Sequence, residues 1–214
     1  MKLNRVILVI DNDVSSYKGI LRFSDTLAAR AYHCANRTEL TDWVSEYKHQ
    51  FAIHNYLVCV VFDPKYSEII KARPALDFLH HAPKICISHP VHLAKALRIM
   101  SAELFDFIEK PFRLDAMKQT LDQAFTCHEQ ENRVQSQFKT LTKRELQTCE
   151  MIAEGLTSKE ISEKLTISIK TVKVHRANLM RKIHATSITE LLHTYNRFKS
   201  YGKYSLVIPK KYLA

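Results

Sequence analysis

Residues 169–183 carry cationic and amide side chains in a pattern that could read duplex DNA. At about 100° per residue, Val172, Leu179 and Ile183 fall on one side of a helix, so they should pack inward. The opposite side and its flanks carry Lys170, Thr171, Lys173, Val174, Ala177, Asn178 and Arg181. A major groove accepts such a surface, because cations reach guanine acceptors or phosphates, an amide pairs with adenine and a small apolar group touches a thymine methyl. The segment contains no Asp or Glu, which favours a groove-reading helix over one that is merely solvated.

Three helix-start signals surround this segment and predict the elements that hold it. Residues 142–145 and 157–160 are capping boxes, in which a Thr hydroxyl and a Glu carboxylate each satisfy a backbone donor. Ser168 is a third N-cap, and Gly155 is suited to end the helix that starts after Thr142. Three residues join the second and third helices, which is the compact geometry of a helix-turn-helix. We therefore predict helices over residues 142–155, 157–164, 168–183 and 187–198.

Motif positions in this part of the chain resemble the LuxR-type helix-turn-helix family. The matching residues are Leu141-Thr-Lys-Arg-Glu145, Gly155, Lys159-Glu-Ile161, Leu165, Ser168 and Thr171-Val-Lys-Val-His175. The resemblance implies a four-helix DNA-binding domain, here residues 140–199, whose third helix enters the major groove. Lys159 and Arg176 complete the candidate DNA-binding residues. The family's fourth helix often supplies a dimer contact, which would fall on Ile188, Leu191, Leu192 and Tyr195.

The net charge of +10 is concentrated in the last third of the chain. Residues 1–138 hold 17 Lys and Arg against 16 Asp and Glu, whereas residues 139–214 hold 15 against 6. Charge segregated in this way points to an anionic partner such as nucleic acid, and the alternative is a basic surface with no ligand. We expect double-stranded DNA as the partner, bound by a homodimer on two half-sites, because one such module rarely gives enough specificity. RNA polymerase or another regulator is a further candidate partner.

Residues 1–126 alternate short apolar strands with amphipathic helices. Candidate strands are residues 6–10, 32–35, 57–62, 84–87 and 104–108, and candidate helices are residues 15–29, 38–50, 66–79, 90–101 and 113–127. Strands separated by helices pair in parallel, so we predict an α/β doubly wound sheet of five parallel strands, flavodoxin-like in size, followed by a small all-α domain. The polar residues 127–139 are expected to form a linker or the frayed end of the fifth helix. Residues 200–214 form a basic tail, which could grip phosphates, dock as a strand or stay loosely ordered.

Polar residues follow the carboxyl ends of four predicted strands, where a doubly wound sheet places its site. They are Val9-Ile-Asp-Asn-Asp13, Asp63, Ser88 and Phe107-Ile-Glu-Lys-Pro111, and they resemble a response-regulator receiver domain of the FixJ/NarL type. The resemblance implies that Asp63 accepts a phosphoryl group, which Lys110 and Ser88 contact. It implies that Asp11 and Asp13 hold Mg²⁺ beside it, and that the position of Phe107 reports the state of the domain.

One position departs from the receiver pattern. Receivers usually carry two adjacent acids after the first strand, but this chain has Asp11-Asn12-Asp13, so the middle position is an uncharged amide. A site that lacks one acid should bind Mg²⁺ less well. We therefore expect a pseudo-receiver that controls dimerisation or partner binding, with no cofactor unless the pocket is functional and takes Mg²⁺. The alternatives are a regulator phosphorylated on Asp63, and an adaptor whose first domain binds a protein or a small ligand.

Composition argues against several other classes of protein. Three glycines leave no glycine-rich phosphate loop, and no apolar run approaches the roughly 20 residues that span a bilayer, so we expect no membrane partner. Five scattered cysteines favour reduced thiols in a cytoplasmic protein. No nucleophile–base pair emerges, so we expect no enzyme. Trp43 is expected in the core. No common metal-ligand spacing is matched by His80, His81, Cys86, His89 and His92.

Overall fold

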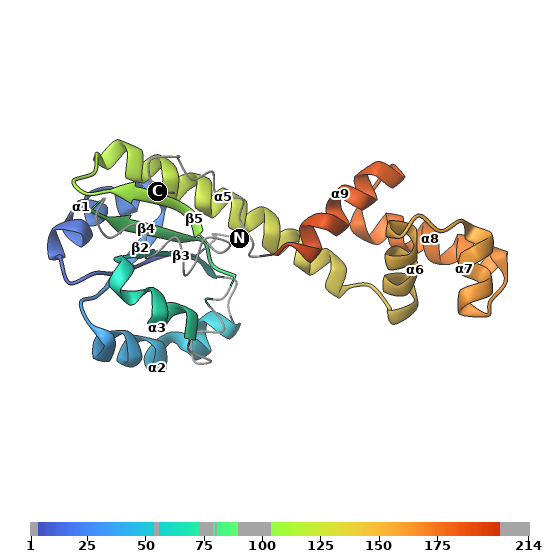
Figure 1. Ribbon diagram of the computed structural model, residues 1–214, viewed down its shortest axis with the longest axis horizontal. Helices are drawn as coiled ribbons and strands as arrows, with labels where there is room; N and C mark the ends of the chain where they lie inside the picture. Colours follow the sequence, from blue (N-terminus) through green and yellow to red (C-terminus); the bar gives the residue numbers. More distant parts are fainter. Residues whose placement is uncertain (1–3, 54–55, 73–78, 80, 90–103, 202–214) are drawn as a thin grey trace, which may run out of the picture. The chain divides into compact units, whose positions relative to one another are not determined.

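The computed structural model describes residues 4–53, 56–72, 79, 81–89 and 104–201 of the 214-residue chain. They divide into two compact units, one within residues 1–129 and the other formed by residues 130–201 (Figure 1). The first unit contains the sheet, and the second is helical. Among the described residues, no helix combines the length and the apolar character that crossing a bilayer requires.

Five parallel strands form the sheet of the first unit, in the order β2-β1-β3-β4-β5. They are β1 (Asn4–Ile10), β2 (Ala29–Cys34), β3 (Tyr56–Phe62), β4 (Lys84–Ser88) and β5 (Leu104–Glu109). In β1, which lies between β2 and β3, Ile7 pairs with Ala31 on one side and with Cys59 on the other. Each predicted strand overlaps an observed one, and the strand order is that of the flavodoxin-like doubly wound fold. The predicted fold class is therefore confirmed.

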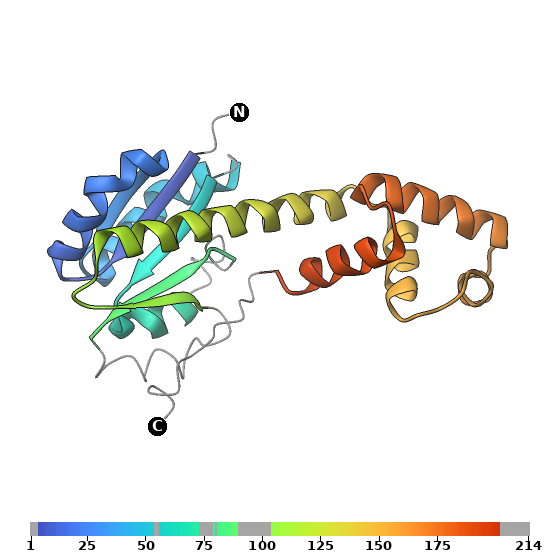
Figure 2. The same cartoon turned by 90° about the horizontal axis from the view of Figure 1, so that it is seen from above.

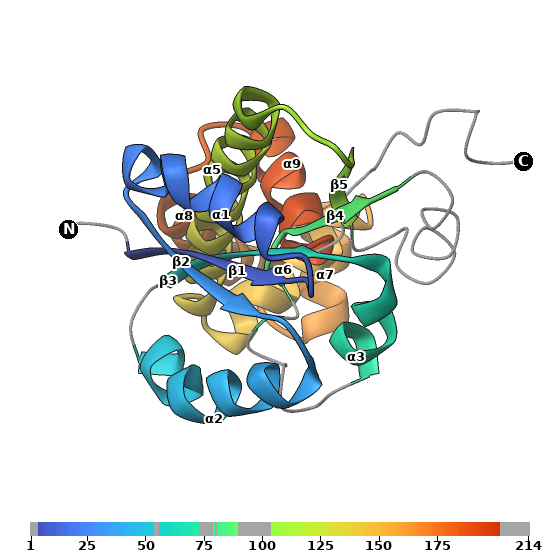
Figure 3. The same cartoon turned by 90° about the vertical axis from the view of Figure 1, so that its left-hand side faces the viewer.

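Different helices cover the two faces of this sheet. They are α1 (Val14–Ser24), α2 (Arg37–Ile53), α3 (Ser67–Ala72) and α5 (Leu114–Lys139), with short 3₁₀ helices at Asp25–Leu27 and Pro64–Tyr66. Alternate residues of β1 point to opposite faces: Ile7 and Val9 pack in one core cluster, Leu8 and Ile10 in the other. The first cluster contains side chains of α1 and α5, which lie side by side (Figures 2 and 3). The second contains side chains of α2 and α3, including Trp43, as predicted.

Helix α5 continues through the residues that were expected to form a linker or the frayed end of this helix. Residues 127–139 are helical throughout, so the predicted helix end at residue 127 is wrong. Val134 and Phe138 are 7% and 4% exposed and belong to the core of the second unit. They lie four residues apart, on one face of the helix. Two apolar residues among polar neighbours are too short a pattern to predict a helix from sequence, and it is packing that stabilises this one.

Four further helices build the second unit, and each begins at a capping residue. They are α6 (Lys143–Ala153), α7 (Ser158–Leu165), α8 (Ile169–Ile183) and α9 (Ile188–Lys199). Both predicted capping boxes are present, at Thr142 and at Thr157. Gly155 follows α6 with a φ of +86°, the left-handed conformation that glycine adopts most easily. The predicted helix-turn-helix is therefore confirmed in its element bounds.

Several predicted features lie outside the described residues. These are the helix at residues 90–101, residues 202–214 of the tail, and His80 and His92. Of the helix predicted over residues 66–79, the structure describes α3.

Candidate nucleic-acid interface and receiver pocket

Helix α8 has a buried side and an exposed side, as its sequence predicts. Val172 and Leu179 have no exposed surface and Ile183 is 3% exposed, whereas Val174 is 52% exposed. The buried side chains join the core of the second unit. Ser168 fixes the start of the helix, because its hydroxyl accepts the Thr171 N–H at 3.0 Å. The turn from α7 into α8 therefore presents one polar side of α8 to solvent.

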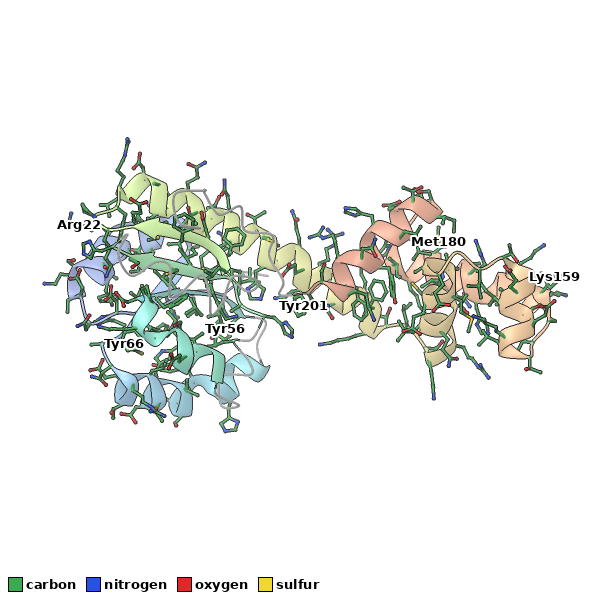
Figure 4. The ribbon with its side chains drawn as sticks, viewed as in Figure 1. Arg22, Tyr56, Tyr66, Lys159, Met180 and Tyr201 are labelled. Atoms are coloured by element: carbon green, nitrogen blue, oxygen red, sulfur yellow. The ribbon has the colours of Figure 1, made fainter. Side chains whose placement is uncertain are left out.

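Five cationic side chains on α7 and α8 have no acidic partner among the described residues. Lys159 lies on α7 (Figure 4), and the other four belong to α8, which contains no Asp or Glu. Within the part of the chain that the structure describes, none of these side chains makes a hydrogen bond or an ion pair. Their charges are therefore available to phosphates or base edges. The five residues are Lys159, Lys170, Lys173, Arg176 and Arg181.

Arg176 differs from the other residues predicted to contact DNA. It follows Val172 by four residues, so it shares the buried side of α8, and it is half-buried. Thr171 and Asn178 are half-buried on the flanks of the exposed side. The fully exposed candidates on α8 are Lys170, Lys173, Val174, Ala177 and Arg181. The structure thus brings most of the predicted residues to one surface and places Arg176 at its edge.

Lys182, the neighbour of Arg181, has a structural partner. Its Nζ donates to Glu145 Oε2 at 2.7 Å and to the Thr140 carbonyl oxygen at 3.1 Å. Glu145 is 3% exposed and also accepts the Thr142 N–H at 2.7 Å. Burial tends to raise the pKa of Glu145, but the hydrogen bonds from Lys182 and Thr142 outweigh it and lower that pKa. Sequence reasoning missed this ion pair, because no local pattern joins residues on two different helices.

The predicted dimer contact on α9 is largely occupied within the chain. Leu191 has no exposed surface, and Leu192 and Tyr195 pack against the core of the second unit. Phe138 of α5 stacks on Phe198 of α9 with ring centroids 4.2 Å apart. Leu191 therefore cannot reach a second copy of the chain while this core is intact. Of the four predicted residues, Ile188 is exposed, at 40%, and Leu192 and Tyr195 are half-buried.

Three carboxylates and one ammonium group meet at the carboxyl ends of β1, β3 and β5. The Lys110 Nζ donates a hydrogen bond to Asp11 Oδ2, and it lies 3.8 Å from Asp63 Oδ2 and 4.0 Å from Asp13 Oδ2. Asp11 is fully buried, and its other oxygen accepts the Asp13 N–H at 3.0 Å. The peptide bond between Lys110 and Pro111 is cis. The structure therefore assembles the acids and the lysine that the sequence predicts.

The residues predicted to hold Mg²⁺ are engaged with protein groups. Asp11 is paired with Lys110, and Asp13 caps α1 by accepting the Ser15 N–H at 2.9 Å. The hydrogen bonds from Ser15 lower the pKa of Asp13, and the charge of Lys110 adds to this effect. Asn12 is exposed and offers an amide without charge. Among the described residues, no three His, Cys, Asp or Glu side chains are arranged to hold a metal ion. The donor set therefore fits Mg²⁺ poorly.

The other predicted pocket residues have partners of their own. Ser88 is 1% exposed, and its hydroxyl donates to the His89 carbonyl oxygen at 2.7 Å. Phe107 is half-buried and packs against the core cluster beneath α2 and α3. Asp63 accepts the Lys65 N–H at 3.1 Å, and its side chain is 23% exposed. The Asp63 carboxylate is thus accessible to solvent, whereas the Ser88 hydroxyl donates its hydrogen bond to the backbone.

Comparison with known proteins agrees with both parts of this description. Residues 139–195 match the family described as "Bacterial regulatory proteins, luxR family". The chain is 30% identical over 151 residues to the response regulator protein TmoT of Ectopseudomonas mendocina, an alignment that covers 66% of this chain and 69% of that protein. It is 32% identical over 136 residues to the transcriptional regulatory protein FixJ of Rhizobium meliloti, covering 60% of this chain and 67% of that protein. Among solved structures, full-length FixJ from B. japonicum aligns with a TM-score of 0.45 and 23% identity, over 92% of this chain and 98% of that one.

Proposed function

Because this chain belongs to the LuxR-type response regulators, and is therefore a DNA-binding transcription regulator, we propose that it reads double-stranded DNA through α8 as a homodimer. The observation that carries the proposal is the exposed side of α8, where cationic side chains have no acidic partner among the described residues. Two copies would place two α8 helices on half-sites about 34 Å apart. On α9, the exposed Ile188 would pack against the second copy. We place this activity in the cytoplasm, with RNA polymerase or another regulator as a further partner.

We also propose that the receiver-like domain controls dimerisation or partner binding without being phosphorylated. The pairing of Lys110 with the buried Asp11 supports this, because the lysine supplies the positive charge that Mg²⁺ would bring. At position 12 the chain has an uncharged Asn in place of the carboxylate that would help to bind Mg²⁺. A phosphoryl transfer to Asp63 depends on a cation that neutralises the incoming group.

The domain boundaries that we propose are residues 1–126 for the receiver-like domain and residues 140–199 for the DNA-binding domain.

The DNA-binding surface is tested by removing one exposed charge from α8. Lys173→Ala should weaken operator binding by about tenfold or more, because it removes a charged contact from each protomer. Lys118→Ala is the matched control, since Lys118 is an exposed lysine on α5 within the first unit. Fluorescence anisotropy on an operator selected from random DNA measures both affinities. Equal affinities of the two variants would contradict the assignment of α8.

The state of the receiver is tested with acetyl phosphate and Mg²⁺, followed by mass spectrometry of the intact chain. We expect no phosphoryl group on the natural chain. Asn12→Asp restores the missing acid and should allow Mg²⁺-dependent phosphorylation, which a second substitution, Asp63→Asn, should abolish. Phosphorylation of the natural chain that is lost in Asp63→Asn alone would show a phosphorylation-dependent regulator instead.

A further inference from the structure

A cavity of about 460 Å³ lies beside the carboxylate cluster of the first unit. Its walls are one side of α1, the segment that runs from Lys110 to the start of α5, and His89, which follows β4. It shares Asp13 and Lys110 with the cluster but does not include Asp11, Asp63 or Ser88. A cavity of this size is in the range that small-molecule ligands occupy. The cavity therefore opens beside the carboxylate cluster and is lined by a largely different set of side chains.

Gly19 lets α1 approach the opposite wall of the cavity closely. A Cβ atom on Gly19 would lie 3.1 Å from Leu114 Cδ2 and 4.0 Å from Phe112 Cε2, so the missing side chain is what makes room for these two. A glycine inside a helix costs roughly 1 kcal/mol relative to alanine, so Gly19 makes α1 less stable than an alanine at this position would. Leu114 remains 36% exposed at the cavity, although it is a large apolar residue. The wall formed by Pro111, Phe112 and Leu114 therefore offers an apolar surface to a ligand.

The α1 wall adds positive charge to this apolar surface. Lys18 and Arg22 are four residues apart, so their side chains lie on the same side of α1. Both are exposed, and neither makes a hydrogen bond or an ion pair with any residue that the structure describes. Figure 4 shows Arg22 at the surface of the first unit. The one carboxylate that lines the cavity, Asp13, already accepts the Ser15 N–H. A ligand would therefore meet two unpaired cations beside an apolar wall.

We propose that this cavity binds a small organic anion, a carboxylate attached to an apolar body. The carboxylate would lie between Lys18 and Arg22, where charge-assisted hydrogen bonds are strongest, and the apolar body would lie against Phe112 and Leu114. The proposal rests on the proposed function, because a receiver that is not phosphorylated needs another input. A ligand here would contact Lys110 and the start of α1, both of which belong to the carboxylate cluster.

Benzoate is the probe, because it joins a carboxylate to a flat apolar ring. Titration of the ¹⁵N-labelled full chain, followed by NMR, should show saturable shifts of the Gly19 and Leu114 amides with a dissociation constant of about 1 mM or less. Benzyl alcohol, which has the ring without the charge, and inorganic phosphate, which has charge without the ring, should each bind at least about tenfold more weakly. Absence of saturable shifts with benzoate, or equal binding of all three probes, would overturn the proposal.

Charge removal then tests which residues hold the anion. Lys18→Gln with Arg22→Gln should weaken benzoate binding about tenfold or more, and thermal stability should stay unchanged because both residues are exposed. Arg30→Gln with Lys143→Gln removes the same charge from exposed positions outside the cavity and should leave binding intact. Equal losses in both double variants would overturn the assignment.

A third variant separates this proposal from the proposed function. Asp63→Asn lacks the phosphoacceptor, so it should bind benzoate as the natural chain does. If acetyl phosphate modifies Asp63 of the natural chain, the phosphorylation-independent receiver fails while the anion site stands. If benzoate binding is lost in Asp63→Asn, the ligand binds at the carboxylate cluster, and the proposal of a separate anion site fails.

Discussion

His128 is a titratable group that the folded chain keeps away from water. It is 6% exposed on α5, and its Nδ1 donates to the Val58 carbonyl oxygen of β3 at 3.1 Å. Burial lowers the pKa of His128 from 6.5 to about 4, although the Val58 hydrogen bond acts in the opposite direction. The unfolded chain therefore binds a proton between these two pH values that the folded chain does not. His128 therefore leaves the free energy of unfolding unchanged above pH 6.5, and it lowers that free energy progressively as the pH falls toward 4.

The first unit should therefore lose about 3 kcal/mol of unfolding free energy from this residue between pH 6.5 and pH 4. Denaturant unfolding followed by the fluorescence of Trp43 measures it, because Trp43 is the single tryptophan and lies in the core of this unit. His128→Gln should flatten the pH dependence, whereas His193→Gln, an exposed control in the other unit, should not. Parallel pH profiles for the natural chain and His128→Gln would contradict the prediction.

The resemblance to receiver domains predicted which side chains gather at the carboxylate cluster, and the parallel strands that end at one edge of a sheet agreed with it. Asp11, Asp63 and Lys110 meet there as expected. The same reasoning could not show that Lys110 pairs with Asp11, or that the Ser88 hydroxyl donates to a backbone carbonyl, because both depend on side-chain geometry. It also missed the cavity beside Gly19, which arises from two distant segments.

At the scale of elements, prediction succeeded where a local signal was strong. Buried parallel strands are continuous apolar runs, and the helices of the second unit begin at Thr or Ser caps, so both could be placed from sequence. It failed at residues 127–139, where tertiary packing decides. Phe138 shows why: it is a core residue that packs against Tyr195, which lies on a helix distant in sequence.

Two neighbouring cations on α8 should separate folding from DNA binding. Lys182→Met should destabilise the second unit by about 2 kcal/mol, because it leaves the buried Glu145 carboxylate without its cation. Arg181→Met should weaken DNA binding and leave the stability unchanged, since Arg181 is exposed and has no partner among the described side chains. Hydrogen exchange of the α6 and α8 amides measures the first effect, and anisotropy the second. Similar exchange rates in the two variants would contradict the assigned roles.

At the scale of the whole molecule, charge distinguishes the two parts of the chain. Residues 139–214 hold 15 basic against 6 acidic residues, whereas residues 1–138 are nearly balanced. A regulator whose affinity comes from phosphate contacts releases counterions, so the logarithm of its affinity falls linearly with the logarithm of salt concentration. Six phosphate contacts would lower the affinity about 10³-fold between 50 and 200 mM salt.

The salt dependence also tests the proposed homodimer. Lys170→Ala should reduce the magnitude of the salt slope by about 1 for each protomer bound, and hence by about 2 for a dimer. Operator affinities measured between about 50 and 200 mM salt give both slopes. A reduction near 1 would mean that one copy of the chain binds each site, and an unchanged slope would mean that Lys170 does not contact a phosphate. Because Lys170 is exposed and makes no hydrogen bond or ion pair with other described residues, its loss should act on the DNA complex and leave the fold intact.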